Sequence, residues 1–423
     1  MKFDDFCKAL DLPTDFSAAI QLRWEELTDG ADVSSIPYFI NEAYFRRYYP
    51  YCKGNYSLEE IMPYVENVIR IVKMTPALNL LAQMLFKGAY QLTPPFENYK
   101  LPFPLKPLGE EYTGVFNLMI SLGAYPLITE AYASIGVPET YALNVLQWIG
   151  GTMPPFAEAH HGLPGRPGFF HWHRHYINKK LFRIGRLEYL LHPFVEWGPA
   201  IFKNRAGDLA VLCGDGWQLN CNDRRTKEPS EAVFCSRLTE DERGITGTPI
   251  APDGCVLFDS AITLSKDEWR PLVSPWDLCP SIHIPGGARM PFDDVLASMK
   301  EAKEFFATYF KRRVPLFVCC SWILNPIWED LLPYSNMARF RKEGYAFPGV
   351  DWGKRAGMEF LFGRADVPPE ELPAHNNAQR AMQEASQKGQ IGTGGVFFLT
   401  DDLDKLGDEY YRKHSQWIGQ TAK

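Results

Sequence analysis

The sequence predicts an α+β protein, with a helical N-terminal domain at residues 1–155 and a mixed α/β domain at residues 156–423 whose sheet is mostly antiparallel. Three observations lead to this fold class. Apolar side chains recur at helical spacing through the first 150 residues. Residues 153–168 are rich in Pro, Gly and His, which indicates a domain boundary. Short strand-like segments then follow one another without helices between them, which favours an antiparallel meander.

Helix-start signals define the N-terminal domain. Ser57 and Glu60 have the spacing of a capping box, and apolar residues follow them at helical spacing. Pro76 suits the first position of the next helix, because a proline there gives up no hydrogen bond. Further helices are expected at 113–136 and from Pro138 to 151, with a proline-rich loop at 93–109.

The mixed domain begins with strands and then changes its pattern. A strand, a Gly-Gly loop and a long amphipathic helix precede a continuous apolar strand of the fully buried type. The expected strands are 182–191, 209–213, 261–264, 281–284, 315–322, 358–362 and 396–399. The expected helices are 292–310 and 326–343, and the polar segment 220–248 is expected to be a loop.

Composition and charge narrow the classes of function. The chain has 44 basic and 51 acidic residues, a net charge of −7, which argues against nucleic-acid and anionic-membrane binding. The acidic N-terminus lacks a secretory pattern, and the longest apolar run is too short to span a bilayer. The nine cysteines include no CxxC pair, so we expect reduced thiols in a cytoplasmic protein. Cys319 and Cys320, inside an apolar run, are expected to be buried and inert.

The loop between the strand and the long helix is a candidate anion site. Gly286 and Gly287 let the backbone approach a ligand closely, and Arg289 adds a positive charge. Free N–H groups where a loop opens a helix bind anions, and a diphosphate suits such a loop. Asp293 and Asp294, in the first turn of the helix, would compete with a bound phosphate.

This order of elements resembles the GNAT acyltransferase family, and more specifically a group of bacterial acyltransferase-like proteins. Those proteins have a helical N-terminal acyltransferase domain ahead of a GNAT-like C-terminal domain. The resemblance spans residues 182–345. It is carried by the segments Phe182–Tyr189, Ser281–Gly287, Cys320–Leu324 and Asn336–Tyr345, the last of which looks like the closing helix of the family.

The resemblance implies transfer of an acyl group, acetyl or longer, from acyl-CoA to a small-molecule or peptide amine that attacks directly. In that fold the two strands flanking the long helix separate and expose backbone N–H groups for the thioester carbonyl. The resemblance assigns CoA binding to Ile284, Gly286, Gly287, Ala288 and Arg289. The phosphate loop is shorter than the usual one of the family. The acyl group, the acceptor and the oligomeric state stay open.

The proton-transfer residues are less well determined. The family often has a tyrosine acid where this chain has Phe340, which leaves Tyr334 either as a substitute or as a packed aromatic. His283, Glu188 and His192 are the candidate bases, because a histidine titrates near neutral pH and a buried carboxylate gains basicity. His283 is otherwise a structural histidine, and Glu188 otherwise pairs with a nearby arginine. Ser321 either binds a ligand or satisfies the backbone.

Two other functions remain open at this stage. One is a non-catalytic protein of the same fold that binds acyl-CoA or a small molecule, a hypothesis motivated by Phe340. The other is a metal-dependent hydrolase that uses five clustered histidines, although no acidic group completes a ligand set and no metal is expected. Those histidines are His160, His161, His171, His173 and His175. Their alternative interpretation is a mobile, partly solvated linker between the domains.

Overall fold

The computed structural model describes residues 1–96, 101–191, 194, 197–274, 276–286, 289–353, 355–363 and 365–414. The chain divides into two compact units. The first comprises Met1–Ile184 with Pro285–Arg289, and the second comprises Gly185–Ile284 with Met290–Lys423. The first unit runs past residue 155, where the sequence pattern places the boundary.

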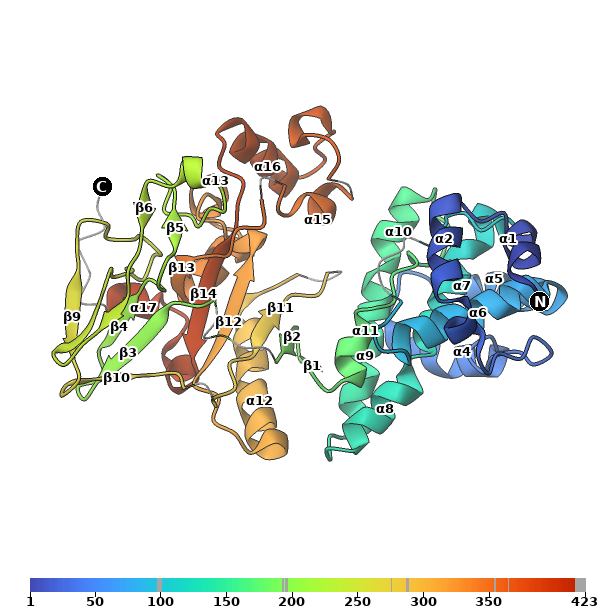
Figure 1. Ribbon diagram of the computed structural model, residues 1–423, viewed down its shortest axis with the longest axis horizontal. Coiled ribbons are helices and arrows are strands. Elements are labelled where there is room, and N and C mark those ends of the chain that lie inside the picture. The colour runs from blue at the N-terminus through green and yellow to red at the C-terminus, as the bar shows by residue number, and fades with distance from the viewer. Residues whose placement is uncertain are drawn as a thin grey trace. The chain divides into compact units, whose positions relative to one another are not determined.

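Helices form most of the first unit (Figure 1). Ser57 and Glu60 form the expected capping box, since Ser57 Oγ accepts from Glu60 N at 3.2 Å and Glu60 Oε2 accepts from Ser57 N at 2.7 Å. The expected helix at 113–136 is two helices, α7 and α8. The elements are α1 (Phe3–Leu10), α2 (Thr14–Leu22), α3 (Trp24–Thr28), α4 (Glu42–Tyr48), η1 (Tyr49–Cys52), α5 (Leu58–Met74), α6 (Pro76–Tyr90), α7 (Gly109–Leu122), α8 (Tyr125–Ala133), α9 (Glu139–Gly151), α10 (Met153–Ala159), α11 (His173–Ile177) and β1 (Leu181–Ile184).

The glycine- and proline-rich segment after α10 is a packed strap. Gly165 has a φ of +136°, and a Cβ there would lie 2.2 Å from the backbone of Gly114 in α7. Arg166 N donates to Gly114 O at 3.1 Å, and the Arg166 side chain is fully buried. Two glycines therefore allow backbone-to-backbone contact, which joins the strap to the helical core. This contact extends the first unit beyond residue 155.

The second unit is built around a mixed sheet with the strand order β2-β11-β12-β14-β13 (Figure 1). β11 pairs antiparallel with β2 and parallel with β12, whereas β14 pairs antiparallel with both β12 and β13. The strands of this sheet are β2 (Leu187–Leu190), β11 (Ser281–His283), β12 (Leu316–Ser321), β13 (Tyr345–Pro348) and β14 (Gly394–Leu399). The sheet is therefore mostly antiparallel, as predicted.

Short strands precede this sheet in the chain. They pair antiparallel as β10-β3-β4, β5-β6 and β7-β8-β9. The expected loop at 220–248 is wrong in part, because this segment contains three short strands, of which β6 pairs with β5 and β8 pairs with both β7 and β9. These elements are β3 (Ala200–Asn204), β4 (Leu209–Leu212), β5 (Gln218–Leu219), η2 (Pro229–Glu231), β6 (Phe234–Cys235), β7 (Thr239–Glu240), β8 (Gly244–Gly247), β9 (Ile262–Ser265) and β10 (Trp269–Pro271).

The long helix α12 (Phe292–Phe310) has the expected bounds, but two later predictions are wrong. The helix expected at 326–343 breaks before Ser335, whose side chain caps a new helix by accepting from Ala338 N at 3.1 Å. The strand expected at 358–362 is a helix, preceded by Gly357 at a φ of +91°. The elements are η3 (Trp322–Leu324), α13 (Trp328–Leu331), α14 (Asn336–Glu343), α15 (Met358–Phe362), η4 (Pro369–Glu371), α16 (Asn377–Gln387), η5 (Thr400–Lys405) and α17 (Tyr410–Lys413).

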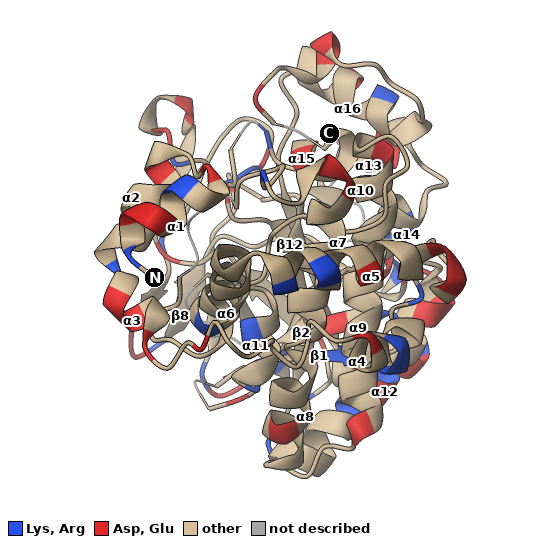
Figure 2. Ribbon diagram, turned by 90° about the vertical axis from the view of Figure 1, so that its right-hand side faces the viewer, with Lys and Arg blue, Asp and Glu red and all other residues tan. Residues whose placement is uncertain are grey.

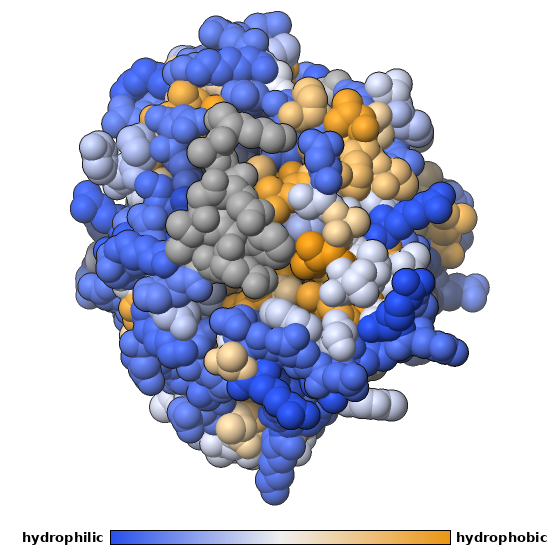
Figure 3. Space-filling model, turned by 90° about the vertical axis from the view of Figure 1, so that its left-hand side faces the viewer, coloured by the Kyte–Doolittle hydropathy of each residue, from blue (hydrophilic) through white to orange (hydrophobic). Residues whose placement is uncertain are grey.

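The surfaces of the described residues carry mixed charge. Figure 2 shows acidic and basic residues interspersed along the helices, with acidic residues in the first turns of α1 and α3. Figure 3 shows a mostly hydrophilic face with apolar side chains gathered near its middle.

Among the described helices, none is by itself long and apolar enough to span a membrane. The helices α5 and α6 meet that test only when they are taken together, across a bend of 108°.

Candidate active site

The two faces of the central sheet have different surroundings. Tyr189 of β2 points to α12, because its hydroxyl lies 2.9 Å from Ser298 Oγ and its ring lies 5.1 Å from that of Phe317. Side chains alternate along a strand, so the neighbours of Tyr189 and Phe317 point to the opposite face. Glu188 of β2 and Cys320 of β12 therefore share the face of the sheet away from α12.

β11 and β12 lie side by side at one end and separate at the other. Among the described residues their register contains a single pair, Ser281 opposite Val318, and Val318 N donates to Pro280 O at 3.1 Å. β12 nevertheless continues to pair with β14 as far as Ser321. In a parallel ladder every second residue of a strand turns its N–H to the same neighbour. The N–H of Cys320 therefore points to the β11 side of the strand, beyond the last ladder pair of the described residues. We call this end of the β11–β12 pair the notch.

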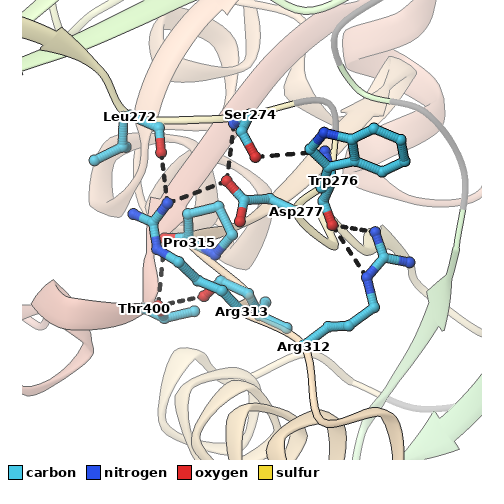
Figure 4. Close-up of polar contacts among 9 residues, drawn as sticks. Leu272, Ser274, Trp276, Asp277, Arg312, Arg313, Pro315 and Thr400 are labelled. Carbon is cyan, nitrogen blue, oxygen red and sulfur yellow. Dashed lines mark hydrogen bonds and ion pairs between the residues drawn. The ribbon is translucent and has the colours of Figure 1, made fainter.

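Polar contacts hold the closed end of this notch together (Figure 4). Arg313 Nη1 donates to Asp277 Oδ2 at 3.1 Å and to Leu272 O at 3.0 Å. Asp277 Oδ2 also accepts from Ser274 N at 2.8 Å, and Leu278 N donates to Arg313 O at 3.0 Å. These contacts join the segment entering β11 to the segment entering β12. The two strands are thus fixed where they begin and diverge only toward their ends.

Two of the predicted site residues lie opposite each other in the sheet. His283 of β11 is the register partner of Glu188 of β2. Antiparallel partners have Cβ atoms about 4.5–5.5 Å apart and share a face. The Glu188 side chain is buried and that of His283 is half-buried. This geometry places a carboxyl group beside an imidazole on the same face as Cys320.

The other predicted proton-transfer residues lie elsewhere. Ser321 shares the face of Phe317, toward α12, and its hydroxyl accepts from Ile323 N at 3.4 Å as a cap for η3. The side chain of Tyr334 is fully exposed, with a relative accessibility of 101%. Phe340 is buried, with its ring 5.2 Å from that of Phe398. The structure therefore does not bring Ser321, Tyr334 or Phe340 together with His283 and Glu188.

The predicted CoA-binding loop is described in part. Gly286 and Arg289 are exposed and Ile284 is half-buried, whereas Gly287 and Ala288 lie outside the described residues. By its contacts the segment Pro285–Arg289 belongs to the first unit. The base candidate His192 also lies outside the described residues.

The thiols of β12 are poor nucleophiles at neutral pH. Burial raises the pKa of the Cys320 thiol to about 11, although a hydrogen bond from Val350 N and the charge of Arg225 act in the opposite direction. Burial also raises the pKa of the fully buried Cys319. A protonated thiol does not attack a thioester readily.

A polar cavity of about 820 Å³ lies in the second unit, and the sequence analysis missed it. One wall comes from the polar segment after β5, including Arg224 and Arg225, and the other from the residues that precede β14. Burial lowers the pKa of Arg224 to about 10. Arg225, which lines the cavity, also acts to lower the pKa of the Cys320 thiol. Three carboxylates, Glu228, Glu231 and Asp351, complete the lining.

The clustered histidines occupy separate environments in the first unit. His173 is fully buried, with Nδ1 3.1 Å from Tyr90 Oη, and burial followed by the charge of Arg166 holds its pKa well below the usual value. His160 Nδ1 instead lies 3.3 Å from Glu110 Oε1. In the described part of the chain, no three His, Cys, Asp or Glu side chains are arranged to hold a metal ion. The described histidines therefore do not support the hypothesis of a metal-dependent hydrolase.

Comparisons with known proteins agree with this architecture. A crystal structure of an acyltransferase in complex with decanoyl-CoA and teicoplanin aligns with a TM-score of 0.57 at 16% identity, covering 94% of this chain and 99% of that one. An acyltransferase variant in complex with octanoyl-CoA aligns over the same shares at 16% identity and a TM-score of 0.56. No curated protein matches in sequence. Residues 181–397, just over half of the chain, match the family of the GNAT-like C-terminal domain, and the chain belongs to this family.

Proposed function

We propose that this protein is an acyl-CoA-dependent N-acyltransferase. The observation that carries the proposal is the notch between β11 and β12, which opens after the Ser281–Val318 pair inside a GNAT-like domain. The structural neighbours described as acyltransferases in complex with acyl-CoA support the same assignment.

The notch suits a thioester carbonyl. When an amine attacks, negative charge develops on the carbonyl oxygen, and fixed backbone N–H donors stabilise such charge without reorganising. The N–H of Cys320 is one such donor, because it lies beyond the end of the ladder. The exposed Gly286 and Arg289 have the properties that a diphosphate requires. The helix terminus itself is less suited, since Asp293 and Asp294 occupy its first turn.

His283 is the proposed general base. It accepts a proton from the attacking amine through its imidazole, and Glu188 stabilises the imidazolium and orients the ring. The tetrahedral adduct then collapses, the C–S bond breaks, and CoA leaves as a thiolate that takes up a proton. The polar cavity beside Arg225 is the proposed acceptor site. Its two arginines and three carboxylates suit a polar amine that carries further charged groups.

The proposal is tested by measuring thiol release from acetyl-, octanoyl- and decanoyl-CoA. The acceptors are a panel of small amines and of peptides with a free amino terminus. We expect turnover in the wild type. The substitution His283→Asn should lower kcat about 10²–10⁴-fold, and Glu188→Gln should shift the pH profile of kcat/KM. Tyr334→Phe, at an exposed position, is the control and should keep full activity. Absence of turnover with every pair, or full activity of His283→Asn, would overturn the assignment.

A non-catalytic protein of the same fold is the second candidate. The buried Phe340 favours it, because the position of the family acid is filled by a side chain that cannot donate a proton. That function predicts a rise in unfolding temperature on adding octanoyl-CoA but no thiol release with any amine. Measuring both quantities on one preparation separates the two candidates.

A further inference from the structure

The first unit contains a cavity that the proposed reaction does not use. Its volume is about 560 Å³, within the usual range of small-molecule sites. Six phenylalanines from α2, α10, the strap and the loop after α6 form much of its wall. They are Phe16, Phe96, Phe103, Phe156, Phe169 and Phe170.

One residue of this wall carries a buried polar atom that has no partner among the described residues. Asn117 of α7 lines the cavity and is 1% exposed. Its Nδ2 donates to Arg166 O at 3.2 Å, which fixes the orientation of the amide, because that carbonyl only accepts hydrogen bonds. Its Oδ1 has no hydrogen-bond partner among the described residues. Such an oxygen is costly to bury unless a ligand donates to it.

The charge of the wall restricts the ligand further. The described residues that line the cavity include no Lys, Arg, Asp or Glu. Against these described side chains, an ionised group would lose its hydration without a counter-charge in the lining. Phe103 and Phe169 are 37% and 45% exposed, so they form the rim of the cavity. The ring of Phe103 packs on that of His160, with the ring centroids 4.3 Å apart.

We propose that this cavity is a binding site for a neutral, largely apolar molecule that carries one hydrogen-bond donor. The aromatic side chains contact the apolar body of the ligand, and its hydroxyl or N–H donates to Asn117 Oδ1. The site lies within the first unit and is assembled from its residues alone.

Fluorescence titration of the full-length protein with N-phenyl-1-naphthylamine tests the site, because this neutral probe has apolar rings and one N–H. We expect saturable binding and much weaker binding of 1-anilinonaphthalene-8-sulfonate, which adds a charge to the same rings. The substitution Ala89→Phe fills the cavity and should lower the affinity at least tenfold. Ala133→Phe, at an exposed position of α8, is the matched control and should bind as the wild type does.

Competition against the bound probe tests the role of Asn117. In the wild type, 1-octanol should displace the probe about fivefold more tightly than its methyl ether, which corresponds to one hydrogen bond. Asn117→Leu should remove that difference. The proposal is overturned by the absence of saturable binding, by an unchanged affinity in Ala89→Phe, or by an undiminished alcohol preference in Asn117→Leu. Should Asn117→Leu fail to fold by circular dichroism, the Ala89→Phe comparison still decides.

Discussion

Removing the charge of Glu329 should strongly destabilise the second unit. Glu329 of α13 accepts two hydrogen bonds from Arg412 of α17, at 2.8 and 2.6 Å, and a further one from Arg341 of α14. Arg341 also donates to Asp253 O in the loop before β9. One carboxylate therefore pairs with two arginines, and through them it connects three helices and a loop of the second unit.

The burial of this network sets the magnitude. The side chains of Glu329, Arg341 and Arg412 are 17%, 6% and 19% exposed. Removing one partner of a buried ion pair costs about 3–5 kcal/mol, because the other charge stays buried without compensation. For a unit of this size, about 4 kcal/mol corresponds to a fall in Tm of about 8–16 °C.

Scanning calorimetry of Glu329→Gln checks this value. The matched control is Glu384→Gln, whose carboxylate pairs with Lys388 at 2.7 Å with both side chains about half exposed. An exposed pair contributes about 0–1 kcal/mol, so the control should lower Tm by no more than about 4 °C. Equal shifts in the two variants would refute the argument from burial.

The pH dependence gives a second check on the same residue. Burial raises the pKa of Glu329, but the hydrogen bond from Arg412 and the charge of Arg341 outweigh it, so its pKa lies below the ordinary value. A carboxyl group with a depressed folded-state pKa stabilises the fold above its unfolded pKa, about 4.3, and loses this effect as the pH falls through the folded value. The difference in Tm between wild type and Glu329→Gln should therefore be full at pH 7 and shrink below about pH 4.

Three further outcomes follow from the packing. Ser321→Ala should leave thiol release within about twofold of wild type in the same assay, because its hydroxyl caps η3 on the α12 side of the sheet. Gly165→Ala should lower stability in urea unfolding by at least about 1–3 kcal/mol, since its φ of +136° and its contact with Gly114 both exclude a Cβ. Phe340→Tyr should lose about 1–3 kcal/mol in the same measurement, because it buries a hydroxyl where the structure has a packed ring, and it should not increase turnover.

Capping residues and apolar periodicity predicted the helices whose ends are set by residues close in sequence. The capping box at Ser57 predicted the start of α5, and the apolar face of α12 predicted both ends of that helix, because capping and periodicity act within a few turns. The segment 358–362 failed because its apolar run has the composition of a strand. Its helix instead depends on Gly357 and Gly363, both at positive φ, and on packing of Met358 against residues distant in sequence.

The candidate site was predictable in part for a related reason. His283 and Glu188 were each found from a strand pattern, but their pairing depends on the register between β11 and β2. Register is a property of two strands distant in sequence, so neither pattern alone contains it. Ser321 lies on the other face of the sheet from His283, and its own segment could not show this, because the face depends on the contact of Phe317 with Tyr189. The polar cavity was missed because its walls come from segments about 160 residues apart.

The donors proposed for the notch are backbone N–H groups, which any residue except proline supplies. The proposed reaction is therefore compatible with a shorter phosphate loop and with the buried Phe340. The more constrained features are the contacts that fix where β11 and β12 begin. They are the Arg313–Asp277 pair (Figure 4) and the hydrogen bond from Leu278 N to Arg313 O. Activity should therefore be more sensitive to a shift in the relative position of the two strands than to the identity of the side chain at Cys320, whose thiol stays protonated at neutral pH.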